Sequence, residues 1–212
     1  MTRVVIADDH TIVRQGLRSL LSTAGGISVV GEAADGREAL AVVERQQPEV
    51  LLLDLSMPGL NGVEALRRVK EVSPRTRVLV LSMHAGQDYV RPAVRAGAAG
   101  YLVKGAGLDH LLEALQAVAS GGTFYGPEAE AVLAATAPGQ SVEDSLELLT
   151  GREREVLQLV AEGKSNRDIG DLLGISPKTA DAHRTNIMRK LDLHDAQALT
   201  RYAVGRGLVP GG

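Results

Sequence analysis

Residues 50–62 read Val-Leu-Leu-Leu-Asp-Leu-Ser-Met-Pro-Gly-Leu-Asn-Gly, and this stretch decides the fold of the first part of the chain. It begins with an aliphatic run that ends in a carboxylate at Asp54, and a loop containing Pro58 and Gly59 follows. A short, continuously apolar run is typical of a strand buried on both faces of a parallel sheet. The stretch therefore predicts a central strand at Val50–Asp54 with an acidic residue at its carboxyl end.

Further apolar runs of similar length lie on both sides of this strand, at Arg3–Ala7, Ser28–Ala33, Val78–Ser82 and Ala99–Val103. Between the runs, apolar residues recur at the 3.6-residue spacing of amphipathic helices, and the pattern is weakest around Asp88–Ala96. Strands that alternate with helices indicate an α/β fold with helices on both faces of a parallel sheet. We expect a (βα)5 doubly wound domain over residues 1–120.

The last part of the chain carries only helical signals. Thr150 with Glu153 and Ser165 with Asp168 each fit a capping box at a helix start. A short turn containing Gly174 between two predicted helices indicates a helix-turn-helix. We expect an all-α, four-helix unit over residues 146–212, in which the later helices cover Asn166–Leu173, Pro177–Leu191 and about Asp195–Arg206.

The segment 121–145 has the composition of a linker. It contains Pro127, Pro138 and Gly139, and residues 125–148 hold five acids and no bases. A short helix at Pro127–Thr136 is predicted inside it, because proline suits the first turn of a helix.

Composition and charge narrow the classes of function. The chain has no cysteine, which excludes disulfides, thiolate catalysis and cysteine-based zinc sites. The net charge is −3, yet residues 149–212 hold ten bases against eight acids, which favours a polyanionic partner there. No apolar run reaches the roughly 18 residues of a membrane span, and the first residues reach Asp8 too early for a signal peptide. We expect a cytoplasmic protein with no membrane partner.

Polar residues gather where the predicted strands end. Asp8 and Asp9 close the first strand, Asp54 the third and Ser82 the fourth, while Lys104 follows the fifth. The carboxyl ends of parallel strands form the functional edge of such a sheet. Converging carboxylates repel one another and need a cation, and oxygen ligands beside a phosphoryl group favour Mg²⁺. A carboxylate nucleophile, a hydroxyl and an ammonium group are suited to phosphoryl transfer, although each residue alone is commonly a cap, turn or surface residue.

The first 120 residues resemble the receiver domain of two-component response regulators. The similarity lies in residues 4–10 (Val-Val-Ile-Ala-Asp-Asp-His), 51–62, 80–82 (Val-Leu-Ser) and 97–104 (Gly-Ala-Ala-Gly-Tyr-Leu-Val-Lys). The resemblance implies that Asp54 is the phosphoacceptor and that Lys104 contacts the phosphoryl oxygens. It implies Mg²⁺ ligation by Asp9, Asp54 and the Ser56 carbonyl, with Asp8 acting through water, and a switch in which Ser82 moves and Tyr101 turns inward.

Two positions in this part of the chain are unusual. Gly105 follows the lysine where receivers often have proline, so the rigidity of that loop differs. His84 lies two residues past Ser82, at a position that borders the hydrolytic water in the family. We hypothesise that His84 influences the rate of dephosphorylation; the alternative is a solvated loop histidine.

The predicted helix Pro177–Leu191 has the character of a DNA-recognition helix. Ala180, Ile187 and Leu191 share one face, which should pack inward. From Lys178 to Lys190 the helix carries four bases and one acid, although charge alone also describes a solvated surface. The expected DNA contacts are Lys178, Thr179, Asp181, Ala182, Arg184, Thr185, Arg189 and Lys190.

Residues 146–210 resemble the DNA-binding domain of the LuxR/NarL/FixJ class, most clearly over 149–169 and 173–191. Gly170 stands where a helix former such as alanine is usual, at a cost of ~1 kcal/mol, and Ala180 stands where valine is usual. The resemblance implies a dimerisation surface on the last helix, at Ala198, Leu199 and Tyr202. These apolar residues are equally suited to the core of the domain.

Together these features predict a DNA-binding transcriptional response regulator of the NarL/FixJ family, and not an enzyme. A histidine kinase would phosphorylate Asp54, and the modified protein would dimerise on an inverted repeat in double-stranded DNA, with RNA polymerase as a further candidate partner. One alternative is a LuxR-type transcription factor that works without phosphorylation. Another is an enzyme with an aspartyl nucleophile, but such enzymes place an Asp-x-Asp motif after the first strand, where this chain has adjacent acids.

Overall fold

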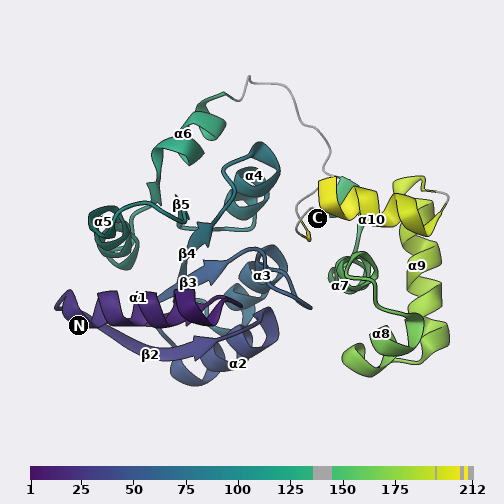
Figure 1. Cartoon of the computed structure of the whole chain (residues 1–212), viewed down its shortest axis with the longest axis horizontal. Helices are drawn as coiled ribbons and strands as arrows, with labels where there is room; N and C mark the ends of the chain where they lie inside the picture. Colours follow the sequence, from purple (N-terminus) through teal and green to yellow (C-terminus); the bar gives the residue numbers. More distant parts are fainter. Residues whose placement is uncertain (136–144, 194, 206–207, 210–212) are drawn as a thin grey trace. The chain divides into compact units, whose positions relative to one another are not determined.

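The computed structural model describes residues 1–135, 145–193, 195–205 and 208–209. The chain divides into two compact units, Met1–Thr136 and Ala137–Gly212 (Figure 1). Within the described residues, no helix is both long enough and apolar enough to cross a bilayer.

The first unit is built on a parallel sheet in the order β2-β1-β3-β4-β5-β6. The expected doubly wound α/β fold is confirmed, and a sixth strand extends the five that the sequence predicts. This strand, β6, pairs with β5 over only two residues, too few to give a periodic signal. The strands are β1 (Thr2–Ala7), β2 (Ile27–Ala33), β3 (Val50–Asp54), β4 (Arg77–Ser82), β5 (Gly100–Val103) and β6 (Phe124–Tyr125).

Helices cover both faces of this sheet because successive strand residues point to opposite sides. Leu51 and Leu53 belong to the core under α2 (Gly36–Gln46), α3 (Gly62–Val72), α4 (Gln87–Arg95) and α6 (Pro127–Ala134). Val50 and Leu52 instead belong to the core under α1 (Thr11–Thr23) and α5 (Leu108–Ala119). The expected burial of β3 on both faces is therefore confirmed.

The segment that the sequence suggests as a linker is partly folded. Both β6 and α6 come from it, and α6 packs against α4 and β5. The Gly126 N–H at the start of α6 donates a hydrogen bond to the Tyr101 carbonyl over 2.9 Å. This interaction fixes α6 to β5, the strand that Lys104 follows. The later residues of the suggested linker, 136–144, lie outside the described part of the chain.

The polar edge of the sheet forms at the switch point between β1 and β3, where the strand order reverses. The loop after β3 folds back closely here, because a Cβ atom on Gly62 would lie 2.3 Å from the Asp54 carbonyl oxygen. A glycine at the start of α3 is therefore required for the loop to pass beside Asp54.

The second unit is all-α, as expected, with α7 (Gly151–Ala161), α8 (Asn166–Leu173), α9 (Pro177–Leu191) and α10 (Ala196–Gly205) after a short 3₁₀ turn, η1 (Ser145–Leu148) (Figure 1). Both predicted capping boxes are present, at Thr150/Glu153 and Ser165/Asp168. Gly174 ends α8 in the left-handed conformation, with φ at 65°. These local signals start and stop the helices where the sequence predicts.

Gly170 has a structural role that offsets its low helix propensity. A Cβ atom at this position would lie 2.7 Å from the Ile175 carbonyl oxygen, so the turn between α8 and α9 passes close to the backbone of Gly170. The Gly170 carbonyl also accepts the Ile175 N–H over 3.0 Å. The glycine allows the two helices of the helix-turn-helix to approach closely.

Glu153 ties the start of α7 to the end of α9. Its Oε2 accepts hydrogen bonds from the Thr150 N–H (2.8 Å), the Thr150 hydroxyl (3.0 Å) and the Lys190 ammonium (2.7 Å). Burial alone would raise the pKa of the Glu153 carboxyl, but the bonds from Lys190 and Thr150 outweigh it and lower that pKa. The ionised carboxylate therefore stabilises the second unit.

We predict that Glu153→Gln lowers the stability of the second unit by ~1–3 kcal/mol at neutral pH, because charged hydrogen bonds are lost. The carboxylate contribution is present above the unfolded pKa near 4.5 and is lost as the pH falls through the lowered folded pKa. The difference between variant and wild type should therefore shrink on acidification. Amide hydrogen exchange in α7 and α9 measures it. Asp171→Asn, at an exposed position on α8, is the control; equal effects of both variants would contradict the prediction.

Candidate functional site

Three carboxylates converge at the carboxyl ends of β1 and β3. Ligand atoms of Asp8, Asp9, His10 and Asp54 all lie within 4.8 Å of one another. The side chains of Asp8 and Asp54 are only 2% and 3% exposed. Lys104 reaches the same place from the end of β5, and its Nζ lies 2.7 Å from Oδ2 of both Asp8 and Asp54. The fold thus brings together four of the residues that the sequence singles out.

Lys104 holds this cluster together electrostatically. Burial alone would lower the pKa of its ammonium group, but the hydrogen bonds to Asp54 and Asp8 outweigh burial and raise it. The ammonium is therefore charged at neutral pH. The Lys104 ammonium contacts two of the three carboxylates, so negative charge remains in excess in this cluster and favours a further cation.

Asp9 offers an oxygen atom that is suited to bind a cation. Its Oδ1 is buried and accepts no hydrogen bond from any of the described residues. His10 Nδ1 lies 2.8 Å away, close enough for an ion pair but without the geometry of a hydrogen bond. Ser56, whose carbonyl is an expected ligand, donates its N–H to Asp54 Oδ1 over 3.2 Å. Oxygen donors of this kind suit a hard divalent cation.

His10 is a site residue that the sequence analysis did not single out. Its backbone N–H donates to Asp8 Oδ1 over 2.9 Å, and its ring contacts Asp8 and Asp9. The signal was its place directly after the aspartate pair, at the N-cap of α1, where it makes no side-chain capping bond.

Ser82, His84 and Tyr101 form a linked group beside the carboxylates. The Ser82 hydroxyl accepts the His84 N–H (3.1 Å), and the Tyr101 hydroxyl donates to the His84 carbonyl (2.6 Å). Tyr101 is fully buried, so the ring points inward in this structure. Burial raises the pKa of its phenol to about 12, although a hydrogen bond with Ser82 opposes the shift. His84 is half-buried and stacks on Tyr89, with ring centroids 4.2 Å apart, instead of lying free in solvent.

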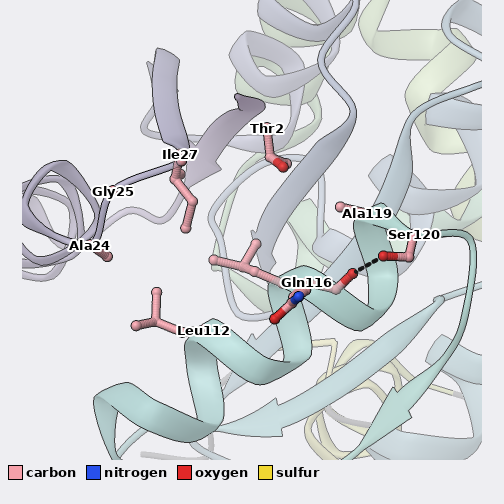
Figure 2. Close-up of a pocket in the computed structure, with 10 residues that line it drawn as sticks. Thr2, Ala24, Gly25, Ile27, Leu112, Gln116, Ala119 and Ser120 are labelled. Carbon is pink, nitrogen blue, oxygen red and sulfur yellow. Dashed lines mark hydrogen bonds between the residues drawn. The ribbon is translucent and has the colours of Figure 1, made fainter.

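A separate pocket lies at the opposite end of the sheet. It has a volume of about 450 Å³ and is lined by residues that include Thr2 at the start of β1, Ile27 at the start of β2 and Gln116 on α5 (Figure 2). The described residues that line it carry no charged side chain. It is therefore distinct from the carboxylate site, which lies where β1 ends.

In the second unit, α9 buries one face and exposes the other. Ala180 and Ile187 are fully buried, and Leu191 packs partly buried against the same core. The expected DNA contacts divide by exposure: Lys178, Thr179, Asp181, Ala182, Thr185 and Arg189 are exposed, while Arg184 and Lys190 are half-buried.

Two expected surface residues have roles inside the domain. The Lys190 ammonium is held by Glu153 and by the Leu148 carbonyl at 3.1 Å, so its expected phosphate contact would compete with these bonds. Leu199 is 0% exposed and belongs to the core of its own unit, the alternative that the sequence also allows. Ala198 and Tyr202 are half-buried on α10.

A parallel sheet with an aspartate cluster at its switch point, joined to a helix-turn-helix unit, defines a signal receiver with a DNA-binding output. Residues 4–116 match the family of the response regulator receiver domain, and residues 147–203 match the luxR family of bacterial regulatory proteins. The chain belongs to the response regulators with a LuxR-type DNA-binding domain, and these are transcription regulators.

Similar proteins match this chain over nearly their whole length. The transcriptional regulatory protein MctR of Rhizobium johnstonii is 37% identical over 207 residues, which cover 98% of this chain and 95% of MctR. The oxygen regulatory protein NreC of Staphylococcus carnosus is 38% identical over 214 residues, covering 98% and 99%. A solved structure is also similar: RcsB from Salmonella enterica serovar Typhimurium, bound to promoter rprA in the presence of the phosphomimetic BeF3−. RcsB is 27% identical in sequence, the TM-score is 0.63, and the match covers 95% of this chain and 97% of the RcsB chain.

We predict that Tyr101→Phe loosens the loop between β4 and α4, because it removes the hydrogen bond to the His84 carbonyl. The local cost should be about 0.5–1.5 kcal/mol. Amide hydrogen exchange over residues 83–87 should speed up accordingly. Tyr125→Phe is the matched control, since it removes a longer bond (3.3 Å) to the Ala98 carbonyl at the other end of β5. Unchanged exchange in the loop of the Tyr101 variant would disprove its anchoring role.

Proposed function

We propose that Asp54 accepts a phosphoryl group from a histidine kinase and that this modification controls DNA binding by the second domain. The observation that carries the proposal is the buried Asp54 carboxylate, held 2.7 Å from the Lys104 ammonium beside Asp8 at the switch point of the sheet. A carboxylate oxygen of Asp54 would attack the phosphorus atom of the phosphohistidine. The new O–P bond forms as the P–N bond breaks, and the histidine ring leaves.

Lys104 supports this transfer by changing partners. In the unmodified protein its ammonium bonds to Asp54 Oδ2. An acyl phosphate would place phosphoryl oxygens near the same ammonium, so Lys104 would exchange a carboxylate for the phosphoryl group without leaving the site. The bond to Asp8 holds the ammonium in place during the exchange.

Mg²⁺ fits the remaining oxygen atoms. We propose that Asp9, Asp54 and the Ser56 carbonyl hold it directly and that Asp8 acts through water. The buried Oδ1 of Asp9, which accepts no hydrogen bond from the described residues, supports this assignment. The ion would supply positive charge against the carboxylates and the incoming phosphoryl group.

The Ser82 group is suited to report the modification. In the proposed switch, the Ser82 hydroxyl turns to the phosphoryl group and gives up the His84 N–H, which alters the loop that Tyr101 holds. Since the Tyr101 carbonyl accepts from Gly126, the change can reach α6 and the chain that leads to the second domain. His84 would also influence the lifetime of the acyl phosphate from this loop.

The exposed side of α9 is the proposed DNA surface. Lys178 and Arg189 would contact phosphates, and the smaller polar residues Thr179 and Thr185 would lie against base edges in the major groove. In its solved structure RcsB, a similar protein, is bound to a promoter, which supports DNA binding by this chain. We further propose that the protein dimerises on an inverted repeat in DNA when Asp54 is phosphorylated, and that RNA polymerase is a later partner.

We place the boundary of the receiver domain after α6 instead of at residue 120.

We predict that acetyl phosphate with Mg²⁺ adds one base-labile phosphoryl group to the full-length protein and that Asp54→Ala abolishes it. Phosphorylation should raise the affinity of the protein for the genomic DNA fragments that it enriches from a sheared pool by roughly 5- to 150-fold, the usual range of allosteric coupling. Intact mass and binding to sheared genomic DNA measure the two effects. Equal DNA binding by wild type and Asp54→Ala under both conditions would favour the phosphorylation-independent transcription factor. Absence of both labelling and DNA binding would refute the proposed function.

A further inference from the structure

The side chain of Asn166 joins two residues of the predicted recognition helix. Its amide Nδ2 donates to Asp181 Oδ1 over 3.0 Å, and its Oδ1 accepts from Arg184 Nη1 over 2.9 Å. A carboxylate can only accept and a guanidinium can only donate, so these two partners fix the orientation of the amide. Asn166 therefore links the start of α8 to one side of α9.

The backbone under this amide is rigidly held. Asn166 is the first residue of α8 and follows Ser165, the N-cap residue. The Ser165 hydroxyl and N–H are both bonded to Asp168, at 2.6 and 2.9 Å, which closes the capping box. The close approach at Gly170 then sets the spacing between α8 and α9. The amide is thus presented to α9 from a fixed position.

The two partners of Asn166 differ in charge, and both are among the DNA contacts expected from the sequence. Asp181 is exposed, and it is the one acid between Lys178 and Lys190 in the sequence. Arg184 lies three residues further along the same helix and is half-buried. A carboxylate in place of the amide would neutralise Arg184, whereas a neutral amide orients the guanidinium and leaves its positive charge for a polyanion.

We propose that Asn166 is a positioning residue for DNA recognition. It holds the guanidinium of Arg184 in one orientation before DNA arrives and ties the Asp181 carboxylate to α8. Ordering a long side chain on binding costs free energy, and a side chain that is ordered in advance avoids that cost. The inference rests on the proposed function, because it requires that α9 binds DNA.

A double-mutant cycle in the full-length protein tests the inference. The probe is the genomic DNA fragment that wild type enriches most strongly, and affinity is measured for Asn166→Ala, Arg184→Ala and the double variant. Asn166→Ala should weaken binding by about 2- to 13-fold, the equivalent of ordering one flexible side chain. In the Arg184→Ala background the same change should have little further effect, since Asn166 acts through Arg184.

Lys178→Ala provides the matched control cycle. Lys178 is an exposed basic residue of the same helix, and neither hydrogen bond of the Asn166 amide involves it. The losses of DNA-binding free energy caused by Asn166→Ala and by Lys178→Ala should therefore add in the double variant. Asn166→Asp adds a second readout, because it keeps an acceptor for Arg184 but places a negative charge beside it and beside Asp181. It should bind DNA more weakly than Asn166→Ala, and the difference should shrink at high salt.

The possible outcomes separate the inference from the proposed function. If wild type binds no DNA fragment, the proposed function fails and the inference fails with it. If wild type binds but the Asn166 and Arg184 losses combine independently, Asn166 has only a structural role and the inference alone is overturned. Amide exchange in α8 and α9 checks the fold. Should Asn166→Ala disturb it, Asn166→Ser, which keeps a polar side chain but is too short to bond to both partners, replaces it in the cycle and must show the same coupling to Arg184.

Discussion

The buried contact of one ammonium with two carboxylates is the constraint on which the first unit depends. Asp8 directly follows β1 and Asp54 ends the neighbouring strand β3, and their charges would repel without the Lys104 ammonium between them. Lys104 reaches them because β5 ends at Val103, at the level where β4 ends at Ser82. The charge balance therefore depends on the register of the sheet, because a shift of β5 against β4 would move Lys104 away from Asp8 and Asp54.

Much of this arrangement could be predicted from the sequence, because its causes are local or periodic. The apolar run at Val50–Asp54 specifies a strand buried on both faces, and the residue after or at the end of each strand is then placed by topology alone. The helix boundaries of the second unit follow from capping residues such as Thr150 and Ser165. Each of these side chains bonds to a backbone N–H only three residues further along the chain, so the signal is local in sequence.

What the sequence did not predict depends on contacts between distant segments. The two-residue strand β6 forms by pairing with the edge of β5, and two residues are too few to give a sequence pattern that predicts a strand. The basic residue Lys190 looked suited to DNA, and its bond to Glu153, on another helix, is visible only in the folded unit. Leu199 illustrates the same limit, since a helical stripe of apolar residues does not distinguish a core from a surface that binds a second copy.

The two units hold their key cations in different ways, and the difference follows from what each cation must do. Lys104 is buried, where an unpaired charge would be costly, so carboxylates are the appropriate partners, and an incoming phosphoryl group can replace one of them. Arg184 lies at a surface proposed to meet a polyanion, where a carboxylate partner would cancel the attraction. The amide of Asn166 gives orientation without neutralisation. In the receiver, the proposed phosphoryl group would displace one carboxylate partner of Lys104. In the second unit, the proposed DNA would bind Arg184 while the Asn166 amide still holds it.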